Sequence, residues 1–194
     1  MVDATILNIT FKLKMLKSET PQLKFPPESG IRLEANAPLE KLTTFKLGGP
    51  AKGIIHCETP SQLELAVKTL VEKNFKFILI GGGSNLVVSD AGLPCFVIRY
   101  FSQKPLIEQS GNEIIVSGST ILDDLAQFCL EHSLEGLNFI SGIPGSVGGA
   151  IVGNAGAFGK QVGDILKEVT LLSLAGEKKL YRPQNLNSLT ATLF

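Results

Sequence analysis

The clearest hydrophobic pattern lies in residues 51–80, where two apolar runs flank a segment with helical periodicity. The first run, Ala51–Cys57, predicts a short strand. The sequence Ser61-Gln-Leu-Glu64 fits a capping box, and apolar residues then recur on one face of a predicted helix that ends near Lys73. The second run, Lys76–Ile80, predicts another strand. Together these segments predict a β-α-β unit.

Further along the chain, short apolar runs alternate with turn signals. They predict strands at Val87–Val88, Phe96–Arg99 and Glu113–Ser117, a turn at Asp90–Gly92, a helix from about Leu122 to His132, and a hairpin of Val169–Leu174 and Glu177–Tyr181. We expect Thr120 to cap the helix, whose inward side chains should be Leu125, Ala126, Phe128, Cys129 and Leu130. The whole pattern predicts an α+β domain of two unequal halves, about 51–100 and 113–181, with a ligand between them.

Residues 1–30 stand apart from this pattern. The segment begins with the apolar, β-branched run Ala4–Phe11, becomes rich in lysine, and ends in Pro26-Pro-Glu-Ser-Gly30, which marks a boundary. It is interpreted as an N-terminal extension, either an appended helix or a disordered arm. The domain is therefore expected to occupy residues 31–182.

The charge balance excludes several classes of partner. Lys+Arg and Asp+Glu both number 18, so the sequence has no bias toward nucleic acid or an anionic membrane. The longest apolar runs have the length of strands, and the N-terminus lacks the pattern of a secretory signal. These features predict a protein that does not span a membrane and that works in the cytoplasm.

The three cysteines, Cys57, Cys95 and Cys129, are far apart and lie in apolar settings. With no C-x-x-C pair and only two histidines, they do not suggest a metal site, and they are interpreted as reduced core cysteines. His132 falls on the last turn of the predicted helix, where it is interpreted as structural.

A glycine loop follows the second predicted strand of the β-α-β unit. In Gly81-Gly-Gly-Ser-Asn-Leu86, the three glycines are expected to reach positive φ and to let backbone N–H groups converge on a pyrophosphate, with Ser84 and Asn85 adding side-chain donors. No lysine follows the loop, and Leu86 stands where a Rossmann fingerprint needs its third glycine. Taken alone, this loop fits a phosphate cradle or a tight turn.

A second glycine cluster occupies residues 142–159. It contains Gly142-Ile-Pro-Gly-Ser-Val-Gly-Gly149 and Asn154-Ala-Gly-Ala-Phe-Gly159, and no charged residue stands in it before Lys160. Uncharged small residues of this kind suggest backbone that lies close to a large flat ligand. The two clusters are expected to form two walls of one site.

Four motifs in order, Thr43-Thr-Phe-Lys-Leu-Gly-Gly49 and the three glycine segments just quoted, resemble those of UDP-N-acetylenolpyruvoylglucosamine reductases, the flavoenzymes also called UDP-N-acetylmuramate dehydrogenases. The resemblance covers about residues 36–176 and implies the two-subdomain FAD-binding fold of the vanillyl-alcohol oxidase and cresol methylhydroxylase type. It does not reach a C-terminal substrate domain, which is expected to be absent, with residues 183–194 as a truncated tail.

The resemblance also implies a cofactor and a set of contacts. FAD would be held noncovalently, since the loop at residues 81–85 carries no histidine, and NADPH would reduce it. The residues implied in FAD binding are Gly81, Gly82, Gly83, Ser84, Asn85, Leu86, Gly118, Gly142, Ile143, Pro144, Gly145, Ser146, Gly148, Gly149, Asn154, Ala155 and Gly156. No metal is expected.

The catalytic groups of the family do not map onto this chain, so its catalytic residues stay unknown. The family's serine and glutamate belong to the absent domain, and its Tyr-Arg-x-Ser motif would fall near Thr190-Ala191. Tyr181-Arg182 has the right letters at the wrong position and fits the end of a hairpin strand. Phe158 and Asn138 replace a common tyrosine and glutamate.

Three functions follow from these observations. The first is the FAD-binding portion of an NADPH-dependent reductase of UDP-N-acetylenolpyruvoylglucosamine in peptidoglycan precursor synthesis, inactive as this chain alone. The second is a flavin-binding module or remnant without reductase activity. The third is another FAD oxidoreductase of the same fold that acts on an alcohol or hydroxy acid. The sequence does not distinguish NADPH from NADH or give the oligomeric state.

Overall fold

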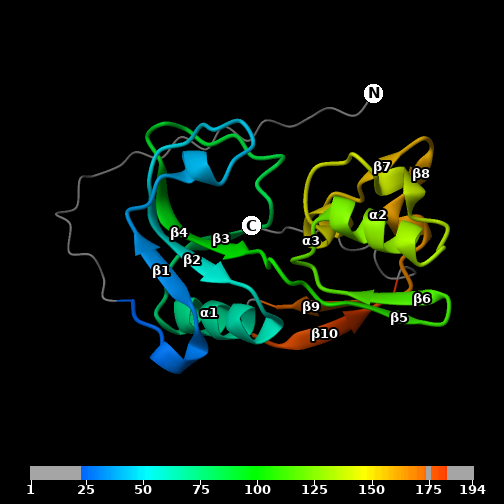
Figure 1. Cartoon of the computed structure of the whole chain (residues 1–194). Helices are drawn as coiled ribbons and strands as arrows, with labels where there is room; N and C mark the ends of the chain where they lie inside the picture. The colour runs from blue at the N-terminus through cyan, green and yellow to red at the C-terminus, as the bar shows by residue number, and fades with distance from the viewer. Residues whose placement is uncertain (1–22, 174–175, 183–194) are drawn as a thin grey trace.

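The computed structural model describes residues 23–173 and 176–182. The predicted run Ala4–Phe11, the tip of the last hairpin at 174–175 and the segment 183–194 lie outside the described residues. Two halves are visible side by side, one around a sheet and the other around two helices, and two hairpins extend along one side of the molecule (Figure 1).

The first half is built on a four-stranded sheet with the order β1-β2-β4-β3. Its strands are β1 (Arg32–Ala35), β2 (Ala51–Cys57), β3 (Phe77–Ile80) and β4 (Leu93–Tyr100). Strands β2 and β3 both run parallel to β4, and β1 is antiparallel to β2. Helix α1 (Pro60–Glu72) joins β2 to β3. The predicted β-α-β unit is confirmed, although β4 lies between its two strands.

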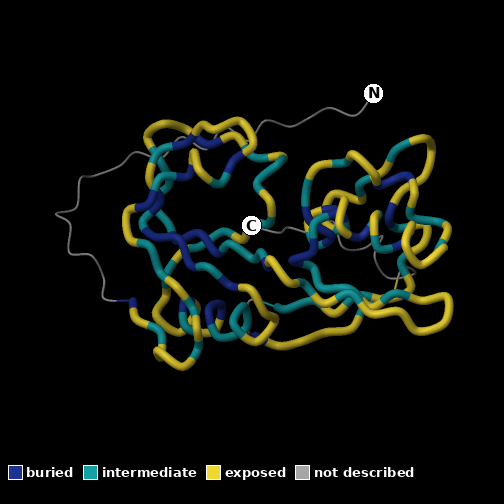
Figure 2. Tube along the Cα trace, viewed as in Figure 1, coloured by how far each residue is buried: buried dark blue, intermediate teal, exposed yellow. Residues whose placement is uncertain are grey.

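Both faces of the central strands are covered, which explains why their sequences are apolar almost throughout. On one face Ile55 of β2 packs with Ala66 and Leu70 of α1. On the other face Ile54 packs with Leu39, from the segment before β2. Figure 2 shows these buried residues in the middle of the sheet and exposed residues in the loops around it.

Helix α1 begins earlier than the predicted capping box, which is wrong by two residues. Thr59 has extended φ and ψ, and its hydroxyl accepts a hydrogen bond from the N–H of Gln62 at 3.2 Å, while the Gln62 side chain accepts from the N–H of Thr59. Pro60 fits the first helical turn because it needs no N–H partner there. Glu64 is thereby free to pair with Lys68 and with Lys178 of β10, each at 2.8 Å.

The second half contains α2, α3 and several short strands. Its elements are the hairpin β5 (Ile107–Ser110) and β6 (Glu113–Val116), α2 (Leu122–Glu131), α3 (Val147–Val152), the hairpin β7 (Gly156–Ala157) and β8 (Lys160–Gln161), and the hairpin β9 (Val169–Leu172) and β10 (Lys178–Tyr181). Short 3-10 turns lie at Pro27–Ser29, Leu39–Lys41, Asn138–Ile140 and Val162–Asp164. The core of the second half contains Leu125 and Cys129 of α2, which pack with Phe139, Ile140 and Val147.

Three local predictions in this region and before it are wrong. Val87–Val88 forms no strand, because the chain there is a loop whose Val88 packs under the sheet while Val87 stays 71% exposed. Thr120 does not cap α2, since its side chain is fully buried and Ile121 occupies the N-cap position without a side-chain bond. Leu130 is 74% exposed because it lies on the outer face of α2.

The described part of the N-terminal segment packs onto the first half. Leu23 is buried in the cluster that contains Ile55, and the Gln62 side chain donates to the Ser29 carbonyl at 2.9 Å. The β9–β10 hairpin also reaches α1, through Lys178–Glu64 and through Leu172. The first half therefore begins before its predicted start at residue 51, and the β9–β10 hairpin of the second half contacts it.

Candidate functional site

The first glycine loop, residues 81–86, begins directly after β3. Since β2, β3 and β4 are parallel, the loop lies at the carboxyl end of the sheet, where α/β sheets usually present ligand sites. Of its glycines only Gly83 has positive φ, at 68°. The expectation of positive φ at Gly81 and Gly82 is wrong, because the turn needs one left-handed residue only. We call residues 81–86 the cradle loop.

The cradle loop leaves its backbone donors free. Among residues 23–173 and 176–182, no acceptor receives a hydrogen bond from any N–H group between Gly81 and Leu86. These residues are partly or fully exposed. Backbone N–H groups without an internal partner either bind water or wait for a ligand's acceptors. A consecutive run of them, with no side chain on the first three residues, suits an anionic group with several oxygens.

The second glycine cluster contacts the cradle loop through its residues 144–146. The Ser84 hydroxyl donates to the Pro144 carbonyl at 3.0 Å, and an added Cβ at Gly82 would lie 3.6 Å from the Cα of Gly145. An added Cβ at Gly81 would overlap the Ser146 hydroxyl. The structure thus brings residues 81–84 and 144–146 together. The hydroxyl proton of Ser84, expected to face a ligand, is instead used between the loops.

We call the contact between residues 81–84 and 144–146 the seam. Gly118, which follows β6, lies beside it in the second half. Its carbonyl accepts from the Gly148 N–H at 2.9 Å, and an added Cβ would lie 3.6 Å from both Gly148 Cα and a ring carbon of Tyr100. The Tyr100 hydroxyl lies 3.0 Å from that of Ser117, which lies 2.8 Å from that of Ser119. This hydroxyl chain was not predicted, although the Ser-x-Ser spacing at 117–119 was its visible sign.

Most of the second glycine cluster is organised by its own hydrogen bonds. Helix α3 begins within it, capped by the Ser146 hydroxyl, which accepts from the Gly149 N–H at 3.3 Å. The Gly142 N–H donates to the Asp123 carboxylate at 2.9 Å. The expectation of a loop open to a ligand throughout residues 142–149 is therefore replaced by a short helix with a tight turn before it.

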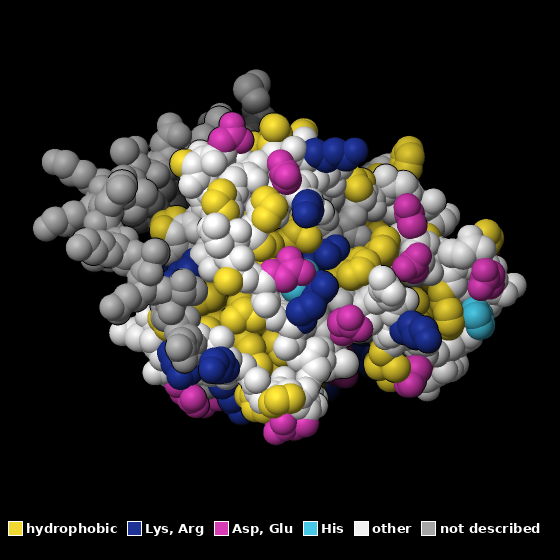
Figure 3. Space-filling model, turned by 60° about the vertical axis from the view of Figure 1, so that its left-hand side comes forward, with side chains coloured by type: hydrophobic (Ala, Val, Ile, Leu, Met, Phe, Trp, Pro, Cys, Tyr) yellow, Lys and Arg dark blue, Asp and Glu magenta, His cyan; other side chains and the backbone are white. Residues whose placement is uncertain are grey.

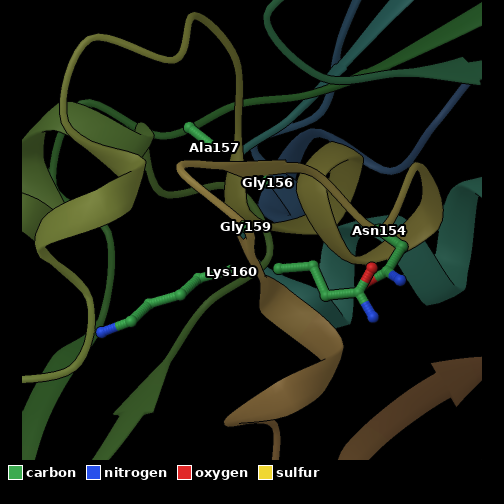
Figure 4. A pocket seen from close by; sticks show the side chains of 6 residues that line it. Asn154, Gly156, Ala157, Gly159 and Lys160 are labelled. Atoms are coloured by element: carbon green, nitrogen blue, oxygen red, sulfur yellow. The ribbon is translucent and has the colours of Figure 1, made fainter.

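Asn154, Ala155 and Gly156 lie at the other end of α3. Asn154 has φ of 43°, and its side-chain oxygen accepts from the Gly163 N–H at 2.9 Å. Within the described ranges no hydrogen bond joins these three residues to the cradle loop. Asn154 and Gly156 border a separate hollow of about 390 Å³ beside the β7–β8 hairpin, where the Asn154 and Lys160 side chains extend to opposite sides (Figure 4).

The Thr43–Gly49 segment entered the prediction only through the resemblance, and the structure places it against the cradle loop. The Thr44 N–H donates to the Gly83 carbonyl at 3.2 Å. An added Cβ at Gly83 would overlap the Leu42 carbonyl. This contact explains why the cradle loop needs a glycine at its left-handed position even without a ligand.

The cradle loop itself contains no ionisable side chain. Arg99 of β4 pairs in register with Ile80, the residue before the loop, and burial lowers its pKa. Burial also raises the pKa of Cys57, to about 12, and the described residues form no group of three or more His, Cys, Asp or Glu that could hold a metal.

On the face seen in Figure 3, basic and acidic side chains are intermixed. No helix in the described ranges has the length and apolar character to cross a bilayer.

The residues of the cradle loop and of the seam fit a dinucleotide cofactor. The cradle loop offers free donors for a pyrophosphate, the space above Gly82 is open except for Gly145, and uncharged backbone from both halves lines the seam. A flat ring system could lie along such a seam with its phosphates on the cradle loop.

Comparison with known proteins supports this assignment. A family described as "FAD binding domain" matches residues 51–178. A UDP-N-acetylenolpyruvoylglucosamine reductase of Alkaliphilus oremlandii is 38% identical over 175 residues, which cover 90% of this chain and 56% of that protein. The chain thus spans about half the length of the curated relatives it matches.

Two solved structures show the same fold. The UDP-N-acetylenolpyruvylglucosamine reductase of Thermus caldophilus superimposes with a TM-score of 0.66 at 32% identity, over 80% of this chain and 54% of that one. Cholesterol oxidase of B. sterolicum superimposes with a TM-score of 0.62 at 16% identity, over 93% of this chain and 37% of that one. The predicted α+β fold of the vanillyl-alcohol oxidase type is confirmed.

Proposed function

The chain belongs to the FAD-binding domain family, and on that basis we propose that it is the flavin-binding portion of an NADPH-dependent UDP-N-acetylenolpyruvoylglucosamine reductase. It would bind FAD noncovalently and serve peptidoglycan precursor synthesis in the cytoplasm. The observation that carries the proposal is the cradle loop, whose free N–H groups lie beside Gly145 of the second half.

The cradle loop and the seam would have separate tasks. N–H groups of residues 81–86 would bind the pyrophosphate, because they are the free donors of the site. Gly118, Gly145 and Gly148 would line the flavin ring, since their lack of side chains lets backbone from the two halves approach. When bound, FAD supplies the hydride transfer, and the protein orients the ring and excludes water.

The reducing step needs more than the flavin, and the family's catalytic residues do not map onto this sequence. A proton donor and a cation that stabilises the enolate are required by this reaction, and each such group typically contributes a factor of about 10² or more in rate. Arg182 does not fill the second role, because its side chain is 69% exposed and lies 3.8 Å from Glu168. We therefore propose that the 194-residue chain, even with FAD bound, does not reduce the UDP-sugar.

A second candidate is a flavin-binding module without reductase activity. The position of Arg182 favours it, as does Thr190-Ala191 in the place of the catalytic Tyr-Arg pair. The third reading, an oxidoreductase for an alcohol or hydroxy acid, rests on the shared fold with cholesterol oxidase. Likeness of fold does not assign a substrate.

The first test is the visible spectrum of the purified chain, before and after FAD is added to the flavin-free form. We expect a flavin spectrum and release of the yellow colour into the supernatant after acid precipitation, because the cradle loop offers no covalent anchor. A chain that is colourless and takes up no added FAD would refute the proposal.

The second test measures NADPH oxidation with UDP-N-acetylenolpyruvoylglucosamine and the FAD-loaded chain. We expect no substrate-dependent oxidation, whereas a typical enzyme turns over at about 10 s⁻¹. Turnover at that rate would contradict the predicted inactivity and make Arg182 the first residue to replace. Substrate-dependent turnover with an alcohol or hydroxy acid instead would favour the third reading.

A further inference from the structure

Residues 43–47, here called the Thr43 loop, are closed on themselves beside the cradle loop. The Thr43 hydroxyl donates to the Leu47 carbonyl at 2.8 Å and accepts from the Leu47 N–H at 3.2 Å. The Lys46 N–H donates to the Thr43 carbonyl at 3.1 Å. With Thr43 buried, these bonds give the loop one fixed shape.

Both ends of the Thr43 loop are fastened to the chain around the cradle loop. On one side the Thr44 N–H binds the Gly83 carbonyl, and on the other side the Gly49 N–H donates to the Ser89 carbonyl at 3.0 Å. Gly48 packs so closely on Val88 that an added Cβ would lie 2.9 Å from its Cβ. The Thr43 loop therefore keeps its place next to the free N–H groups of residues 81–86.

The side chains on this fixed loop are unusual for a surface turn. Phe45 is 59% exposed and Leu47 is 51% exposed, with the cation Lys46 between them. Lys46 has φ of 53°, a left-handed conformation that is about 1–2 kcal/mol unfavourable for a residue with a Cβ. An aromatic ring and a cation held in a strained turn are what a binding loop shows more often than a solvated connection does.

Charge adds a further argument. The cradle loop has no charged residue of its own, so any side-chain cation that pairs with a pyrophosphate there comes from another segment. Lys46 and Lys41, with Glu40 and Thr43, line a hollow of about 460 Å³ at this loop. Two lysines and one glutamate give this hollow a net positive charge, which suits an anionic group.

We propose that the Thr43 loop binds the ADP part of FAD, with Lys46 paired to the pyrophosphate and Phe45 stacked on the adenine. This inference rests on the proposed function, since it requires FAD on the cradle loop. A charge-assisted hydrogen bond to phosphate is roughly twice as strong as a neutral one. Aromatic stacking on the adenine adds specificity for a dinucleotide over a mononucleotide.

The test compares FAD dissociation constants of the wild-type chain, Lys46→Gln and Lys46→Arg. We expect Lys46→Gln to weaken FAD binding by about tenfold, and Lys46→Arg to keep most of the affinity because the charge is retained. At about 1 M salt, where charges are screened within roughly 3 Å, the difference between wild type and Lys46→Gln should shrink. Lys73→Gln, at the end of α1, is the matched control and should change the affinity less than twofold.

Phe45→Ser provides an independent readout. We expect it to weaken binding of FAD but not of FMN, which lacks the adenine, and so to narrow the preference between the two. Thermal unfolding of the flavin-free variants should match the wild type, because both side chains are exposed.

The inference is overturned if Lys46→Gln binds FAD within twofold of the wild type, or if Lys46→Arg loses as much affinity as Lys46→Gln. It is also overturned if Phe45→Ser lowers FAD and FMN affinity equally. These outcomes leave the proposed function intact as long as the wild-type chain binds FAD. A wild-type chain that binds none overturns both.

Discussion

The two glycine-rich regions of this molecule look alike in sequence and differ in what their backbones do. In the cradle loop, the N–H groups have no acceptor within the described residues. In residues 142–149, by contrast, Asp123, Gly118 and Ser146 accept hydrogen bonds from the N–H groups of Gly142, Gly148 and Gly149. We therefore expect the first region to contact a ligand directly and the second to support it.

This difference shows that glycine content alone does not identify a binding loop. Position 148 requires a glycine because Gly118 approaches it: an added Cβ on Gly148 would lie 3.0 Å from the Gly118 carbonyl oxygen. At Gly82 an added Cβ meets only ordinary contacts, so the reason for glycine is sought in the ligand. The two kinds of glycine are distinguished by whether the backbone N–H groups around them have acceptors within the protein.

The largest effect on the free energy of unfolding is expected at Gly83, the glycine of the cradle loop with positive φ. Gly83→Val combines a φ of 68° with an overlap on the Leu42 carbonyl. Strain and overpacking of this kind each amount to about 1–3 kcal/mol, so the flavin-free chain should lose several kcal/mol of stability in urea unfolding. An unchanged urea midpoint would mean that the turn at residues 42–44 can move away freely.

Gly82→Val should have the opposite signature, with FAD affinity reduced and the flavin-free chain about as stable as the wild type. A ligand that approaches the backbone here would clash with the branched side chain, and a loss of about 1–3 kcal/mol corresponds to about five- to hundredfold in the dissociation constant. Isothermal titration and urea unfolding measure the two quantities separately. Equal loss of both would place Gly82 with the supporting glycines.

The control for Gly82 has to be chosen by geometry. Gly92 looked like a plain turn residue, but its φ is 76° and an added Cβ would overlap the Pro50 carbonyl, so its replacement would damage the fold. Gly111, in the β5–β6 turn, has no atom within 4 Å of an added Cβ. Gly111→Val should lower stability through its φ of 61° and leave FAD affinity unchanged.

Asp123→Ala tests the supporting role of the second cluster. Removal of the acceptor of the Gly142 N–H should lower the free energy of unfolding by about 1 kcal/mol and speed hydrogen exchange at that amide. Asp124→Ala is a matched control, because Asp124 shares the first turn of α2 with Asp123. If the two variants exchange equally at Gly142, the hydrogen bond does not hold the loop.

The smallest effect is a dependence of stability on pH in the first half. Burial, and after it the charge of Arg32, lower the pKa of His56 below its ordinary 6.5, with Glu34 opposing and Arg99 adding to the shift. As the pH falls through 6.5, the unfolded chain therefore takes up the proton first and the free energy of unfolding decreases. His56→Gln should flatten the slope between pH 7 and about 5; an identical slope would assign it to other groups.

The sequence predicted the elements that repeat a strong period. Ala51–Cys57 is a strand with both predicted ends, and the helix after it ends within one residue of the expected place, because burial on both sides of β2 and on one stripe of α1 leaves a clear pattern. The start of α1 was misplaced because Thr59 and Gln62 cap it as well as Ser61 and Glu64 could, and only Pro60 in the first turn decides between them.

Other features depend on distant contacts that no local pattern carries. Val88 is buried through Ile54 and Leu39, so its apolar character signalled packing and not a strand. Thr120 was expected at a cap but is enclosed where Val147 donates to its carbonyl at 2.8 Å. The strand β1 was missed because its residues Arg32–Ala35 alternate weakly and owe their pairing to β2.

For the site, the sequence predicted which segments meet and not how they are used. Residues 81–84 and 144–146 do come together, whereas the Asn154 side chain is tied to Gly163 on the far side of α3. The contribution of FAD contacts at each position stays a prediction. The attachment of Thr44 to Gly83 could not be read from composition, because it is a bond between two backbones.

The position of β4 in the sheet has a consequence for how the chain acquires its structure during synthesis. Residues 93–100 lie between β2 and β3, although both of those strands precede them in sequence. In a nascent chain that has not yet released β4, β2 can pair only with β1 and β3 has no neighbouring strand, so the cradle loop follows an unpaired strand. Unpaired strand edges promote aggregation. The nascent chain is therefore exposed to this risk until Leu93–Tyr100 inserts between β2 and β3. Slow translation just before this segment would prolong the exposed state.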